Sequence, residues 1–317
     1  MKSALSASAF PPSPLGLRGT SSATADTSAA PFDSSVSACG AALAQGTLAR
    51  SVSVSVLSAA LVFAATLSVS AQRADLAKAR SLYNQRQFDG AIEAATVAQN
   101  TPATADPASV VLARAHLERY RERANPADLS AARVALGAVR VSNLDARDNV
   151  DYLMALGEAL FFEDDYGAAA ALFESGIDAA IAQGAQAGEA MIEWWGSAVE
   201  RQADALEREA RIAAFQRLRE RMARELARTP GSAAAAYFLV VAARGAGQPI
   251  DAWQAAIAGW VRARLAGSRS ATLRADLDKL VLEGIIPDRV KILPADKRHQ
   301  AESELKGEWA VVKERWK

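Results

Sequence analysis

Few residues of this chain are of the types that catalyse reactions or bind metal ions. The sequence holds two histidines, His116 and His299, and one cysteine, Cys39. Neither histidine belongs to a His-x-x-x-His or His-Glu-x-x-His motif, which would place two ligands on one helix face. The acidic run from Glu163 to Asp165 could support acid–base chemistry or bind calcium, but acidic residues in a turn also commonly cap helices. We therefore predict a protein that is not an enzyme, with no catalytic residues, bound metal or cofactor.

The acidic run lies in the turn between two predicted helices. The apolar face of the first helix recurs at i, i+3, i+4 and i+7: Leu153, Leu156, Gly157 and Leu160. The second helix begins near Tyr166, and its buried face combines small and large residues: Ala169, Phe173 and Gly176. Gly157 costs about 1 kcal/mol of helix propensity relative to alanine, which is understandable if another helix approaches its backbone. Two helices joined by so short a turn must lie antiparallel.

This helical pair resembles the tetratricopeptide repeat. In that family the first helix carries a large residue, a Leu-Gly pair and an aromatic, and the second carries Ala, Phe and Ala. The chain fits this pattern at Leu153, Leu156-Gly157, Ala169 and Phe173, whereas Leu160 replaces the aromatic and Gly176 the last alanine. The resemblance implies an all-α fold, a right-handed superhelical array of antiparallel helix pairs that holds a partner.

Similar spacing recurs on both sides of this pair. Residues 79–98 form a first repeat and residues 192–226 a fourth, in which Trp195-Gly196 follows Leu156-Gly157 by about 39 residues, longer than the usual period of about 34. Residues 110–139 and 237–260 form weaker pairs, which we interpret as degenerate repeats. We therefore assign residues 72–267 to the repeats and residues 268–317 to C-terminal capping helices.

The last predicted helix covers residues 295–317. It carries apolar residues on one stripe: Leu305, Trp309, Val312 and Trp316. Solenoids need terminal helices with a polar outer side. We expect this helix to fold back as a cap, and docking to another protein is the alternative.

The N-terminal region predicts export. Residues 1–47 are rich in Ser, Ala, Pro and Thr, which indicates a disordered preface. Arg50 then precedes a short apolar stretch that ends in small residues, the pattern of a secretory signal peptide. We assign residues 48–71 to this signal, with cleavage after Ala71 and a periplasmic or secreted product. The apolar core is short for a membrane span of about 20 residues, so a retained membrane anchor is the minor alternative.

Two details of this region bear on the same prediction. The preface is unusually long for a signal peptide, and we expect translation to start near Leu48 or Val52 instead. The residues before Cys39 have the shape of a lipoprotein cleavage box, but the apolar core that such a box requires is missing. The mature chain would then contain no cysteine and no disulfide.

Composition supports a helical protein that does not bind nucleic acid. Half of the residues are hydrophobic but only 6% are aromatic, and this alanine-rich composition suits closely packed helices. The formal net charge is zero. The arginines between Arg217 and Arg228 are interrupted by Glu220 and Glu225, as on a solvated helix face. Phosphate binding requires clustered positive charge, which this chain lacks.

The resemblance also implies where a partner would bind. In the family, the first helix of each pair lines a concave groove. The corresponding residues here are Arg80, Tyr83, Asn84, Met154, Glu158, Phe161, Phe162, Ser197, Glu200 and Arg201. Adjacent residues on a helix point about 100° apart, so Phe161 and Phe162 cannot enter the same core. They either pack in two interfaces or leave one ring as an anchor for a partner, and Trp194 beside Trp195 raises the same question. The family's carboxylate clamp does not carry over, because too few of its basic positions are filled.

The favoured hypothesis is an exported, non-catalytic scaffold in a bacterial envelope that binds a protein or peptide through its concave face. One alternative is a structural subunit of an envelope or outer-membrane assembly complex. Another is a carbohydrate- or small-molecule-binding protein, which would require Trp194, Trp253 and Trp260 to gather around one open pocket.

Overall fold

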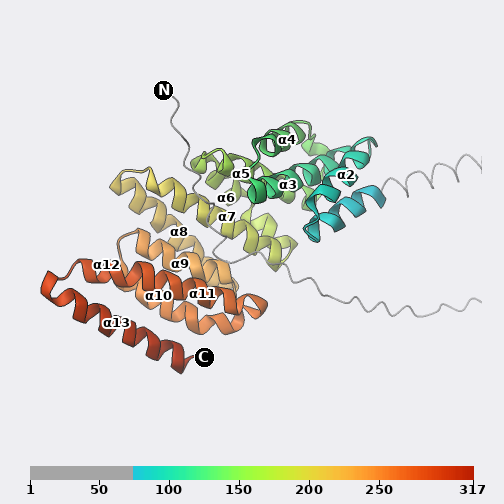
Figure 1. The fold of residues 1–317 in the computed structure, drawn as a ribbon. Coiled ribbons are helices and arrows are strands. Elements are labelled where there is room, and N and C mark those ends of the chain that lie inside the picture. Colours follow the sequence, from blue (N-terminus) through green and yellow to red (C-terminus); the bar gives the residue numbers. More distant parts are fainter. Residues whose placement is uncertain (1–73) are drawn as a thin grey trace, which may run out of the picture.

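A computed structural model describes residues 74–317, and these residues are helical almost throughout, with no β-strand among them (Figure 1). The prediction of an all-α protein is confirmed for this part of the chain. The predicted preface, the signal peptide with its cleavage site, and Cys39 lie outside the described residues.

A helix over residues 74–84 comes first. The elements after it are α2 (Phe88–Gln99), α3 (Ala105–Arg123), α4 (Pro126–Gly137), the 3-10 turn η1 (Val141–Asn143), α5 (Ala146–Phe162), α6 (Tyr166–Gln183), α7 (Ala185–Asp204), α8 (Arg208–Arg228), α9 (Ala233–Gly245), α10 (Pro249–Arg262), the 3-10 turns η2 (Ala263–Leu265) and η3 (Gly267–Arg269), α11 (Ser270–Leu280), the π-turn η4 (Val281–Ile285), α12 (Ile286–Lys291) and α13 (Ala295–Arg315).

Local sequence signals explain where several helices begin and end. Asn125 caps α4, since its side chain accepts a hydrogen bond from the backbone of Ala127 and Pro126 occupies the first turn. Asp145 caps α5 in the same manner through the backbone of Asp148. Between α5 and α6 the chain reverses at Asp164, whose φ of 63° is left-handed. The predicted acidic turn is therefore present.

Each helix packs on the next one along the chain, and Figure 1 shows the pairs following one another from α2 to α13. Alternate helices also touch: α3 contacts α5, α5 contacts α7, α7 contacts α9, and α9 contacts α11. We call these five helices the odd-helix row. Within residues 74–317 the even-numbered helices from α2 to α10 make at most slight contact with one another.

Three glycines let an aromatic ring rest directly on a neighbouring backbone. A Cβ added to Gly157 of α5 would lie within 3.0 Å of the ring of Phe173 on α6. Gly245 of α9 meets the ring of Phe215 on α8 in the same way. Gly196 of α7 meets the ring of Phe238, which comes from α9 and so joins two members of the odd-helix row.

The C-terminal helices close the array. Pro287 has no backbone N–H to donate, and the chain widens into the π-turn η4 immediately before it. Trp309 of α13 is fully buried, with its ring 5.9 Å from that of Trp253 and 5.4 Å from that of Trp260 on α10. Its indole N–H donates to Asp278 of α11 at 2.7 Å. The last helix therefore folds back on the preceding ones, as expected of a cap.

The glycine contacts predict an unusual response to a one-methyl substitution. We expect Gly157→Ala to lower the free energy of unfolding by about 1–3 kcal/mol, because the new methyl group overlaps Phe173 in a filled core. In the control Gly137→Ala the methyl group meets no atom within 4 Å, so alanine should be neutral or stabilising by up to about 1 kcal/mol. Urea denaturation of both variants checks this. Equal effects would contradict the account.

Candidate binding surface

The N-terminal part of the odd-helix row carries charged side chains that are largely withdrawn from solvent. The guanidinium of Arg114 on α3 forms a 2.5 Å ion pair with Asp151 of α5 and lies 4.9 Å from the centre of the Tyr83 ring. Arg121 pairs with Glu118 one turn away at 2.6 Å. Residues of three neighbouring helices thus meet in one polar cluster.

Glu158 of α5 lies inside this cluster and is only 2% exposed. Its burial raises the pKa of the carboxyl group to about 7, although Arg114 and Arg121 favour the charged form. Burial likewise raises the pKa of the Tyr83 hydroxyl. The cluster therefore holds a carboxylic acid that changes its charge near neutral pH.

A second polar cluster lies on α7, α9 and α11. Arg269, just before α11, forms ion pairs with both Glu189 and Glu193 of α7. Asp276 of α11 is partly buried, and desolvation raises its pKa to about 7. Tyr237 of α9 is near enough to Asp276 to be affected by its charge, and burial raises its pKa.

The ten predicted groove residues divide into three groups. Asn84 and Glu200 are exposed. Five others are half-buried: Arg80, Tyr83, Phe162, Ser197 and Arg201. Three are buried: Met154, Glu158 and Phe161. Arg80 forms a 2.5 Å ion pair with Asp148 of α5, which ties the helix over residues 74–84 to the odd-helix row.

The adjacent phenylalanines belong to an aromatic cluster between hairpins. The Phe161 ring lies 5.2 Å from Trp194 and 5.1 Å from Tyr166, and the Phe162 ring lies 5.2 Å from Tyr120 and 5.8 Å from Trp194. Trp194 also stacks on Phe173. Both rings and Trp194 thus pack against neighbouring helices, the first of the two interpretations considered above.

The sequence interpretation overlooked most of the charged residues that the structure brings together. Arg114 and Glu118 stand on α3, where the repeat pattern is weak, and Asp151 precedes the pattern that begins at Leu153 on α5. Glu193 and Asp276 have apolar residues on either side in the sequence. The available signal was a carboxylate beside small or apolar residues, as in Gly157-Glu158 and Glu193-Trp194. Such residues are rarely buried unless they are paired or functional.

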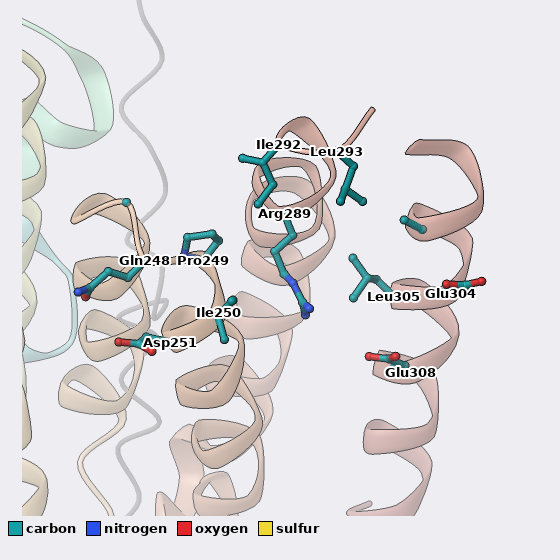
Figure 2. A pocket seen from close by; sticks show the side chains of 12 residues that line it. Gln248, Pro249, Ile250, Asp251, Arg289, Ile292, Leu293, Glu304, Leu305 and Glu308 are labelled. Atoms are coloured by element: carbon teal, nitrogen blue, oxygen red, sulfur yellow. The ribbon is translucent and has the colours of Figure 1, made fainter. Parts of the chain in front are cut away.

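A hollow of about 660 Å³ lies between the start of α10, the end of α12 and α13 (Figure 2). Ile250 and Ile292 on its lining are 64% and 75% exposed. Glu304 and Glu308 stand on the α13 wall, with Arg289 on the opposite side. Arg289 already lies over the ring of Trp253, and Asp251 pairs with Arg219. This groove is open, mixed in charge and separate from the odd-helix row.

Two further observations concern metal ligands and membrane-spanning helices. Between residues 74 and 317 no three or more His, Cys, Asp or Glu side chains gather as metal ligands would. The helices in the same range are all too short or too polar to cross a bilayer.

Comparison with protein-family models, curated proteins and solved structures finds no match.

The raised pKa of Glu158 predicts a pH-dependent stability. Between about pH 4.5 and 7 the folded protein keeps a proton that the unfolded chain releases, so stability falls as pH rises through this range. Glu158→Gln cannot ionise, and at about pH 8 it should exceed the native chain in unfolding free energy by on the order of 2 kcal/mol. The gain should shrink towards pH 4.5.

Denaturation of both proteins across this range measures the difference. Glu220→Gln on the exposed face of α8 is the control and should show a constant difference. A constant difference for Glu158→Gln as well would show that its carboxyl group titrates normally.

Proposed function

We propose that this protein is a non-catalytic scaffold of the tetratricopeptide-repeat type that binds a protein or peptide through its odd-helix row. The observation that carries the proposal is the unequal packing of the two helix sets. Odd-numbered helices touch one another in sequence, whereas the even-numbered ones make at most slight contact within residues 74–317. An array packed more closely along one side bends towards that side, so the odd-helix row would line a concave surface of a right-handed superhelix.

The charges on this row support a binding role. Removing ionised groups from water costs several kcal/mol each, and apolar residues of similar volume often replace buried ion pairs without loss of stability. The row nevertheless holds Asp151, Glu158, Glu193 and Asp276 with their arginine neighbours. A polar surface of this kind suits a polypeptide that is recognised by its charges. In this proposal the scaffold needs no cofactor and works after export, in the periplasm or outside the cell.

One observation favours a second candidate, a structural subunit of an envelope assembly complex. Ile250 and Ile292 are large, exposed apolar residues that line the groove at α13 and belong to no helix of the odd-helix row. Apolar surface is more typical of permanent interfaces than of transient ones. Carbohydrate binding by the tryptophans has less support. Trp253 and Trp260 are buried against Trp309, while Trp194 packs on Phe161.

The test compares two triple variants in affinity capture from envelope extract. The row variant changes Ser197, Glu200 and Arg201 of α7 to alanine, and the control variant changes Arg217, Glu220 and Arg224 on the exposed face of α8. None of these six is fully buried, so both variants should keep their helix content in circular dichroism. We expect a partner that the native chain and the control capture and that the row variant loses by about tenfold or more.

Equal capture by all three proteins would move the binding surface away from the odd-helix row. Loss of the partner in the α8 variant alone would place it on the even-numbered helices. Ile250→Ser with Ile292→Ser then tests the groove at α13, where loss of capture would favour the assembly subunit.

A further inference from the structure

Two carboxylate oxygens of the second cluster are buried without a hydrogen-bond partner among the described residues. One is Oε2 of Glu193, a residue only 5% exposed, whose other oxygen accepts from Arg269. The second is Oδ2 of Asp276 on α11. Buried polar atoms without partners are uncommon in native proteins, and each costs about 1–3 kcal/mol. Both oxygens therefore have the capacity to accept a donor that the chain itself does not supply.

The surrounding charges leave this region acidic. Six carboxylates stand on α7 and α11: Glu189, Glu193, Glu200, Asp204, Asp276 and Asp278. Arg269 serves both Glu189 and Glu193, and Arg244 of α9 is engaged with Asp288 at 2.6 Å. The same helices and Arg269 supply four cations: Arg201, Arg269, Arg274 and Lys279. Lys279 and Arg269 both favour the charged form of Asp276, but the carboxylates still outnumber the cations by two.

Glu200 of α7 is a further carboxylate whose charge acts on Tyr237. The Glu200 side chain is exposed to solvent. Desolvation raises the pKa of its carboxyl group, and the negative charge of Asp204 is the second largest cause of the rise. Burial raises the pKa of Tyr237 on α9, and the charges of Glu200 and Asp276 both add to the rise.

We propose that these acids on α7 and α11 bind a lysine or arginine side chain of the partner, so that a basic polypeptide segment lies across α7, α9 and α11. This inference rests on the proposed function and names the chemistry of its ligand. An ammonium or guanidinium group supplies several N–H donors, which the unpaired oxygens can accept. Its positive charge would also offset the excess of carboxylates. A free polyamine carries the same chemistry, and the test separates the two sources.

The experiment measures fluorescence anisotropy of a labelled peptide that alternates arginine with alanine and glycine, titrated with the full chain. A second peptide has citrulline in place of every arginine and therefore keeps the shape without the charge. The protein variant is Glu193→Gln with Asp276→Asn, and its control is Glu209→Gln with Glu220→Gln on α8. Both variants lose two formal negative charges, and circular dichroism verifies that both remain folded.

We expect the arginine peptide to bind the native chain and the α8 control equally, and the Glu193/Asp276 variant about tenfold more weakly, as the loss of a charged hydrogen bond implies. The citrulline peptide should not bind. Equal binding to both variants would overturn the proposal. The peptide would then be attracted by acidic residues elsewhere on the protein and not by Glu193 and Asp276. Binding of spermidine to the same residues without binding of the peptide would also overturn it, in favour of a free polyamine.

Failure here is distinguishable from failure of the proposed function. If the arginine peptide does not bind while envelope capture still depends on Ser197, Glu200 and Arg201, the scaffold stands and its ligand is not basic. If capture depends on α8 instead, the scaffold proposal fails whatever the peptide does.

Discussion

The fold depends on aromatic rings that rest on the bare backbone of a neighbouring helix. Gly157 meets Phe173, Gly196 meets Phe238, and Gly245 meets Phe215, each too closely for a Cβ to fit. Such contacts replace two side-chain layers with one, which brings helix axes together and buries large rings completely. Because Phe238 reaches Gly196 from α9, this contact also binds two helices of the odd-helix row directly. The close approach of α7 and α9 within that row thus depends on this glycine and phenylalanine.

Close spacing along the row has an electrostatic consequence. Side chains that point from α5, α7 and α11 towards neighbouring odd helices have little room for water, so carboxyl groups there are desolvated. Burial raises the pKa of Glu158 and of Asp276 to about 7. The same packing that stabilises the array therefore generates a surface where charges are strong and incompletely matched. A partner that supplies the missing charge would gain more there than on the solvated face of α8.

The sequence predicted the helices well, because glycine, proline and capping residues mark their ends. The hairpin of α5 and α6 and the buried side of α13 around Trp309 were both apparent from spacing. The charged clusters were not, since they depend on which helices become neighbours across the array. Arg114 and Asp151 are 37 positions apart and pair only because α3 and α5 touch. The contact from Gly196 to Phe238 was missed for the same reason, since it joins α7 to α9 and lies outside the predicted repeat of residues 192–226.

The measurement that tests the central claim most directly is site-specific photo-crosslinking. A photoreactive amino acid is placed at Ser197 on α7, within the odd-helix row, or at Ala223 on the exposed face of α8. Cells that express either protein are irradiated and the adducts are compared. The account predicts a discrete protein adduct from position 197 and none from position 223. An adduct from position 223 alone would contradict it, because the partner would then bind the even-numbered helices.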